Sequence, residues 1–211
     1  MTASGGDTFI TACFATGTRI TTPSGPVAVE MLKAGDLVLA AAGRLAPVRW
    51  IGRRLVDLAR HPRPADIMPV RVRRGAFGGC LPWRDLVLSP DHAVLVRGAL
   101  IPIRHLVNGA SIVQEPRAAV TYWHVELDRH DVILAEGLAC ESYLDTGNRS
   151  AFDNAPGAVA MTPCFARGVW AREGCAEVFT DMAEPRLRAE HTRLLACAWQ
   201  AGDEALALRR A

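Results

Sequence analysis

The chain has 211 residues, of which 50% are hydrophobic, and its formal net charge at pH 7 is +2. This length and apolar content suit one large domain, or one domain with an appendage, and exclude a chain that is disordered throughout. The small net charge gives no argument for a polyanionic partner, and no apolar run reaches the length of a membrane span. Because residues 1–12 lack the basic and apolar regions of a signal peptide, a cytoplasmic location is the default expectation.

Residues 1–12 are small and polar, and we expect a flexible leader there. From residue 13 onward, short apolar runs alternate with turn residues. Such runs, rich in valine and isoleucine and separated by glycine, proline and aspartate, predict an all-β domain. In chain order the runs are RITT, VAVEML, LVLAA, PVRWIG, IMPVRV, DLVLS, HAVLVRG, SIVQ, VTYWHVEL and DVILAEG.

One helical turn is expected at EMLKAGD, and loops or strand ends are expected at 53–64 and 73–79, where arginine, glycine and proline gather. The pattern changes after residue 149, where apolar residues recur at helical spacing behind a proline suited to a first helical turn. These residues are Pro185, Leu187, Leu194, Leu195, Ala198 and Trp199. We therefore expect a leader at 1–12, a β domain at 13–149 and a partly helical C-terminal extension at 150–211.

The six cysteines form no C-x-x-C pair, so the pattern predicts neither a zinc ribbon nor a dithiol redox site. They are Cys13, Cys80, Cys140, Cys164, Cys175 and Cys197. Most of them are expected to be small buried hydrophobic residues. Cys13 is the exception, because it begins the ordered part of the chain and can attack the peptide bond before it.

Three stretches stand out in the β region: CFATGTRI at 13–20, LSPDHAVLV at 88–96 and YWHVELDRHDVILAEGL at 122–138. With these three in this order, and VEMLKAGDLVL after the first, the chain resembles the Hint family, which Hedgehog autoprocessing segments and inteins share. The resemblance runs from Cys13 to about Arg149. It implies a horseshoe of short strands and an activity of self-cleavage.

The residue chemistry supports the same activity. A cysteine thiolate is a strong nucleophile, and attack by Cys13 on the carbonyl of Ala12 would replace the amide by a thioester. That exchange is uphill for an ordinary peptide, so it needs a proton donor for the leaving amine. The resemblance implies His92 as this donor. It also implies Ser89 as the hydroxyl that hydrogen-bonds the scissile amide or the developing oxyanion.

The third stretch indicates which processing is expected. Inteins end there with a His-Asn pair, whose asparagine cyclises to free the chain, whereas this chain has Glu141 and Ser142 at the matching place. The resemblance therefore implies cleavage before Cys13 without full splicing. His124 lies close to the position of an acid that assists the first steps in inteins, although a structural role for His124 is slightly favoured. His130 is expected to support its loop.

A thioester at Cys13 can be resolved by water, a thiol or an alcohol. Asp66 or Asp85 are candidate general bases for the acceptor, and Cys140 is a remote candidate for a second acyl acceptor. The substrate would be the chain's own N-terminal segment, and the domain would be a monomer that needs no cofactor and no metal.

Two other functions remain open at this stage. A Hint fold without turnover would act as a binding or structural module and could keep the same residues. A basic β module could instead bind nucleic acid, because nine arginines lie between Arg44 and Arg74. Trp50 is the single aromatic residue among them, and one tryptophan is not the interleaved pattern that stacks on bases. We therefore expect a solvated face and no nucleic-acid partner.

Overall fold

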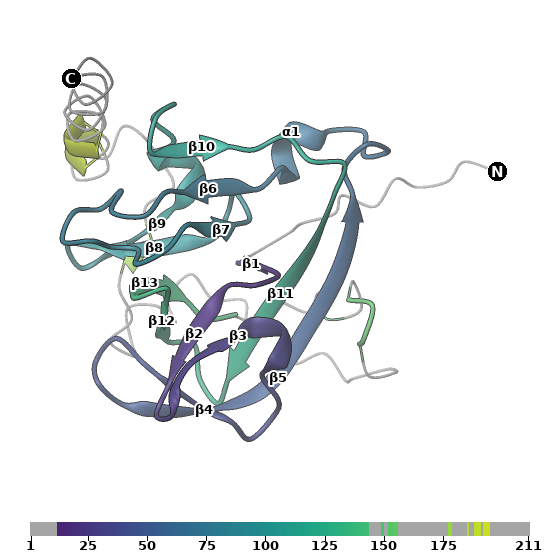
Figure 1. Ribbon diagram of the computed structural model, residues 1–211, viewed down its shortest axis with the longest axis vertical. Coiled ribbons are helices and arrows are strands. Elements are labelled where there is room, and N and C mark those ends of the chain that lie inside the picture. Colours follow the sequence, from purple (N-terminus) through teal and green to yellow (C-terminus); the bar gives the residue numbers. More distant parts are fainter. Residues whose placement is uncertain are drawn as a thin grey trace, which may run out of the picture.

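The computed structural model describes residues 12–143, 149, 152–155, 177–178, 185, 188–190 and 192–194. Most of the regular structure in this part of the chain is β-strand, arranged in two seven-stranded sheets (Figure 1). The all-β architecture that the sequence predicts is therefore confirmed.

Neighbouring strands in both sheets are antiparallel, except that β14 runs parallel to β9. In spatial order, the first sheet contains β10 (Ile112–Gln114), β6 (Val70–Val72), β7 (Leu86–Leu88), β1 (Phe14–Ala15), β11 (Ala119–Leu127), β5 (Leu45–Asp57) and β4 (Leu37–Leu39). The second contains β14 (Glu177–Val178), β9 (Ala99–Pro102), β8 (Ala93–Val96), β13 (Leu138–Glu141), β12 (Val132–Ala135), β2 (Arg19–Thr22) and β3 (Gly25–Ala28).

The long strands β5 and β11 run side by side and form the largest contact between two elements (Figure 1). Strand β1 pairs with the other edge of β11, with Phe14 opposite Trp123 and Ala15 opposite Tyr122. Strand β1, at the start of the described residues, is thereby fixed against the middle of β11.

Strand β5 is longer than the sequence predicts. The sequence predicts a loop or strand end from residue 53, but the strand continues to Asp57. Its exposed arginines alternate with residues whose side chains face inward, such as Val48 and Val56. The sequence of β5 thus has the two-residue alternation of exposed and buried side chains that is typical of a strand. Pairing along the whole length of β11 outweighs the weak strand propensity of Gly52 and the arginines.

Strand β1 separates two apolar clusters, because successive side chains of a strand point to opposite faces. Phe14 belongs to the main core, together with large residues such as Leu88, Ile112 and Ile133. Cys13 and Ala15 belong to a smaller cluster, formed with Val56, Leu58, Ile67, Val87, Val120 and Tyr122. Burial of Phe14 contributes roughly 1.5–3 kcal/mol to folding and anchors the residue next to the candidate nucleophile.

Helical structure in the described residues is short. The turn expected at EMLKAGD is the 3₁₀ helix η1 (Val29–Met31), and the other two helices within residues 12–143 are α1 (Pro64–Ile67) and η2 (Ile103–Leu106). The loop expected at 73–79 is confirmed as a series of turns. No helix in the described part of the chain has the length and apolar character needed to cross a membrane.

The C-terminal extension is described only in part. Pro185, 188–190 and 192–194 are helical, and Leu194 is fully buried in the main core, in agreement with the predicted helix. Leu187, Leu195, Ala198 and Trp199 lie outside the described residues, as do residues 1–11 of the expected leader.

Candidate active site

The backbone of Cys13 is held by Ser89. The Cys13 N–H, which belongs to the peptide bond with Ala12, donates a hydrogen bond to Ser89 Oγ at 3.0 Å. The Ser89 N–H in turn donates to the Cys13 carbonyl at 3.0 Å. The hydroxyl therefore contacts the nitrogen of the candidate scissile amide, which is one of the two positions expected for it.

The thiol of Cys13 meets the imidazole of His124. Cys13 Sγ lies 2.5 Å from His124 Nε2 and 4.0 Å from Nδ1, so Nε2 faces the sulfur. The register explains this contact: Phe14 faces Trp123, which places Cys13 beside the next residue of β11. Cys13 is fully buried, and His124 is 2% exposed.

His92 is the third buried polar residue here. It follows the turn after β7, where its N–H donates to the Ser89 carbonyl at 3.1 Å. Its ring packs on Phe14 with 4.4 Å between centroids. Neither ring nitrogen has a hydrogen bond of good geometry within the described structure. The ring is nevertheless close enough to the backbone of Cys13 and Glu141 for both to favour its protonated form.

Burial decides the charge state of this site. It raises the pKa of the Cys13 thiol well above 9.0, against a hydrogen bond from Ser89 and the positive charge of Arg54. Burial also lowers the pKa of His124 well below 6.5, and the charges of His92 and Arg54 act in the same direction. The pKa of His92 is lowered by burial and partly restored by Glu141. Near neutral pH the site therefore consists of a thiol and two neutral imidazoles.

A model of the Hint domain family matches residues 12–147 of the chain. The chain belongs to the Hint domain family. The resemblance seen in the sequence is thus confirmed, and Hint domains in general act on their own chain. No curated protein matches the sequence.

Several solved structures are similar to this Hint domain. The MchDnaB-1 intein is 18% identical, covering 62% of this chain and 99% of its own, with a TM-score of 0.43. A DnaB intein from Synechocystis is 13% identical, covering 64% and 100%, with a TM-score of 0.44. A bacterial intein-like domain from Clostridium thermocellum is 15% identical, covering 62% and 98%, with a TM-score of 0.38.

Aromatic rings enclose the imidazole of His124. Tyr143 contacts it edge-on at 5.0 Å between centroids, and Phe152 does so at 4.4 Å. Trp50 packs behind both rings. No motif in the sequence marks these aromatic residues as neighbours of His124. Only the pairing of β1 with β11 would have shown that His124 faces Cys13, and a two-residue strand has no readable register in a sequence.

The other candidate residues of this Hint domain lie in different contacts. His130 Nε2 is 3.6 Å from a carboxylate oxygen of Glu141, at the rim of the site. Asp66 forms an ion pair with Arg63 at 3.3 Å. Cys140 is buried in the main core, where burial raises the pKa of its thiol.

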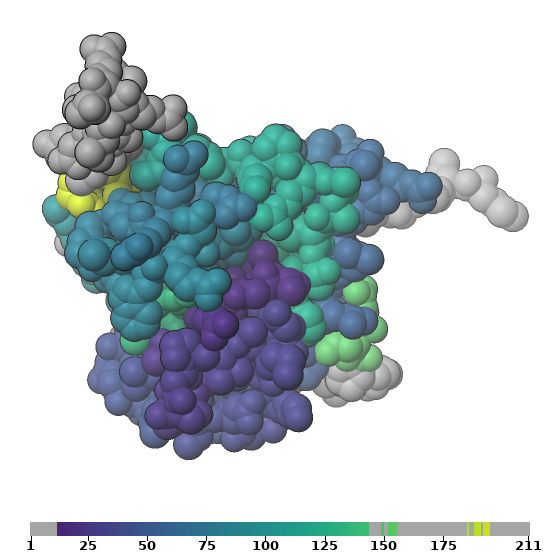
Figure 2. All heavy atoms as spheres, in the orientation of Figure 1, coloured from purple at the N-terminus to yellow at the C-terminus, as the bar shows by residue number. Residues whose placement is uncertain are grey.

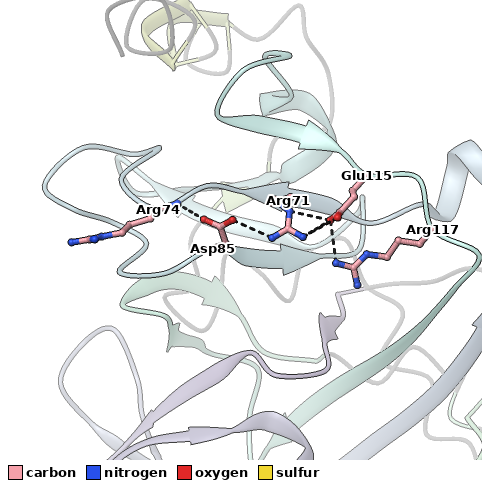
Figure 3. A network of polar contacts seen from close by, with 5 residues as sticks. All are labelled: Arg71, Arg74, Asp85, Glu115 and Arg117. Atoms are coloured by element: carbon pink, nitrogen blue, oxygen red, sulfur yellow. Dashed lines mark hydrogen bonds and ion pairs between the residues drawn. The ribbon is translucent and has the colours of Figure 1, made fainter. Parts of the chain in front are cut away.

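Asp85 belongs to a network of charges on β6, β10 and their connections (Figure 3). Its carboxylate accepts hydrogen bonds from Arg71 Nη1 at 3.1 Å and from the Arg74 N–H at 2.9 Å. Arg71 also forms a two-pronged ion pair with Glu115, at 3.0 and 2.8 Å, and Arg117 joins Glu115 at 3.1 Å. Five of the nine arginines between Arg44 and Arg74 form ion pairs within the described structure: Arg44, Arg49, Arg60, Arg63 and Arg71.

Among the described cysteines, Cys13 and Cys140 are buried and Cys80 is exposed. Within the described ranges, no group of three or more histidine, cysteine and acidic side chains has the arrangement of a metal site.

Proposed function

We propose that this Hint domain cleaves its own chain before Cys13, by an N-to-S acyl shift followed by resolution of the thioester. One observation carries the proposal: Cys13 Sγ is in contact with His124 Nε2, while the N–H of the bond to be broken is held by Ser89 Oγ. A nucleophile beside a base, with the scissile amide fixed next to both, is the arrangement that acyl transfer needs.

In this proposal the proton of the thiol moves to the nitrogen of Cys13. His124 Nε2 takes the proton as Sγ attacks the carbonyl carbon of Ala12, because a thiol with a raised pKa is a poor nucleophile until it loses its proton. The S–C bond then forms and the C–N bond breaks. His92, which lies near the Cys13 backbone, assists the transfer of a proton to the new amine. The numbers of protons and charges are unchanged over the step.

The sequence slightly favours a structural role for His124, whereas the contact of its Nε2 with Cys13 Sγ favours the role of a base. A neutral imidazole can accept the thiol proton, and the depressed pKa of His124 keeps that form available near neutral pH. His92 keeps the role of helping the leaving amine.

Cleavage without splicing is supported by the residues at the end of the third motif. Glu141 accepts a hydrogen bond from the Ala93 N–H at 2.7 Å, and the Ser142 hydroxyl accepts one from the Asp131 N–H at 2.9 Å. Both side chains therefore fix neighbouring strands. Neither has the amide group that asparagine uses to cyclise.

The substrate in this proposal is the chain's own N-terminal segment, and the acyl acceptor is water, a thiol or an alcohol. The experiment is a time course of intact mass on the freshly purified full chain, with and without millimolar dithiothreitol or hydroxylamine. Loss of the twelve residues before Cys13, accelerated by these nucleophiles, is expected.

Cys13→Ala should abolish this loss. Cys80→Ala is the matched control, because it removes an exposed cysteine in the turns before β7, and it should cleave as the parent does. An unchanged mass over days in the folded parent would contradict the proposal and leave a Hint fold that serves as a binding or structural module.

A further inference from the structure

A short segment beyond the family match lies against the site. The match ends at residue 147, and residues 152–154 follow it at the outer edge of β5. In Figures 1 and 2 this segment, in light green, lies beside the blue strand β5 at the margin of the molecule. Arg149, just before it, forms an ion pair with Glu126 of β11 and lies over the ring of Trp50 at 5.2 Å.

Hydrogen bonds fix the 152–154 segment on the β5 backbone. The Asp153 N–H donates to the Arg53 carbonyl at 2.8 Å, and its carboxylate accepts from the Leu55 N–H at 2.9 Å. The Asn154 amide accepts from the Arg53 N–H at 2.7 Å and donates to the Ile51 carbonyl at 2.8 Å. The segment thus occupies backbone groups in a part of β5 that β4 does not cover, and these groups would otherwise bond to water.

These hydrogen bonds place the ring of Phe152 against the imidazole of His124. The two ring planes meet at 84° with 4.4 Å between centroids, and Phe152 is 7% exposed. An aromatic ring in edge contact restricts the rotation of the imidazole and keeps water away from it.

Gly52 provides the space for this ring. It is the cross-strand partner of His124, so a side chain at residue 52 would stand on the same face as the imidazole. A Cβ at Gly52 would lie 2.9 Å from Phe152 Cδ1 and would also collide with Trp50. The φ of Gly52 is not positive, so its backbone conformation does not require glycine. Glycine is required because the rings of Trp50 and Phe152 leave no space for a side chain.

We propose that Phe152 is a positioning residue for autocleavage, which holds the His124 imidazole with Nε2 toward Cys13 and shields it from water. The inference rests on the proposed function of His124 as the base. It makes the 152–154 segment part of the working site, although the segment lies outside the residues of the family match.

The test uses three single variants of the full chain. Phe152→Ala removes the aromatic ring. Gly52→Ala introduces a methyl group that displaces the Phe152 ring, while residues 124 and 152 themselves stay unsubstituted. Asn154→Ala removes the amide that bonds the 152–154 segment to β5. Trp83→Ala is the matched control, because the Trp83 side chain is 49% exposed and packs over Gly137. Phe152→Leu keeps an apolar side chain and serves if Phe152→Ala does not fold.

Two measurements are made on each variant. The first is the rate of cleavage in dithiothreitol across a pH series. Each of the three variants should cleave about 10- to 100-fold more slowly, as expected when a catalytic group loses its orientation, and the acid limb of the profile should move to higher pH. Trp83→Ala should match the parent. Unchanged rates and profiles in folded Phe152→Ala and Gly52→Ala would overturn the proposal.

The second measurement does not need cleavage. In a Cys13→Ala background, ¹⁵N NMR of the imidazole reports the tautomer and the titration of His124, with His92 and Arg54 as the other charged neighbours in every variant. The Phe152 substitutions should raise the midpoint of His124 toward 6.5 and mix its tautomers. A parent that never cleaves would defeat the proposed function alone, and an imidazole unaltered by Phe152→Ala would still overturn the role of Phe152.

Discussion

The thiol of Cys13 and the imidazole of His124 are both buried, and burial disfavours the charged form of each. The resting pair is therefore a neutral hydrogen bond, in contrast to a preformed thiolate and imidazolium. In the proposed cleavage, such a pair would keep the thiol protonated until Cys13 attacks the carbonyl of Ala12. That step would then depend on a base, because little thiolate exists at neutral pH when the thiol pKa is raised.

We expect His124→Gln to slow thiol-induced cleavage by about 100- to 10,000-fold, the usual contribution of a general base. The time course of intact mass in dithiothreitol measures this effect, and circular dichroism verifies the fold. His61→Gln is the control, since His61 lies in the loop before α1 and only accepts a hydrogen bond from the Arg63 N–H. Equal rates for His124→Gln and the parent would assign the base to another residue.

Ser89 carries a second prediction at this scale. Ser89→Ala removes the acceptor of the Cys13 N–H, so cleavage should slow by about three- to tenfold, which corresponds to one hydrogen bond. Ser89→Thr keeps the hydroxyl and should retain most of the rate. A threonine variant as slow as the alanine variant would show that side-chain shape matters here, and that the hydroxyl does not.

At the scale of elements, the site depends on how a two-residue strand meets a nine-residue one. Strand β1 is fixed by β7 on one side and β11 on the other, so Ser89 and His124 approach Cys13 from different strands. Tyr122 adds a tie between β11 and the connection that contains α1, because its buried hydroxyl donates to the Ile67 carbonyl at 2.8 Å.

Tyr122→Phe should therefore lower the free energy of unfolding by about 1–2 kcal/mol, since it leaves the buried Ile67 carbonyl without its partner. Urea denaturation followed by circular dichroism measures this change. Cleavage by the folded variant should stay within a fewfold of the parent, because the hydroxyl bonds to Ile67 and not to Cys13. An unfolding free energy equal to that of the parent would mean that water hydrogen-bonds the Ile67 carbonyl in place of the tyrosine hydroxyl.

The sequence was sufficient for the strands and for three of the site residues, because alternation and turn residues mark short strands and a motif marks Cys13, Ser89 and His92. It was not sufficient for the surroundings of His124. Gly52 looks like a strand breaker in the sequence, yet its absent side chain admits Phe152. The contact between Phe152 and His124 depends on backbone hydrogen bonds to β5, which no local pattern reveals.

For the whole molecule, the buried neutral groups link stability to pH. His92 and His124 have pKa values below 6.5 in the folded chain, so the unfolded chain binds more protons as the pH falls through 6.5. Stability is then lost on the acid side of this value. Cys13 and Cys140 have raised thiol pKa values, so the unfolded chain loses protons first and stability falls as the pH rises above 9.0. The maximum should lie between these limits.

The loss of stability at acid pH gives the sharper test of the buried neutral histidines. Between about pH 7.5 and about pH 5.5, each fully buried neutral histidine should cost up to about 1.4 kcal/mol of unfolding free energy. Urea denaturation of Cys13→Ala, which cannot cleave, measures the loss in the presence of both histidines. The same measurement on Cys13→Ala with His92→Gln and His124→Gln should show most of that loss removed, while the partly exposed His105, whose pKa is also lowered, remains in both chains. An equal loss in the two chains would mean that other groups titrate, and that His92 and His124 already carry charge inside the fold.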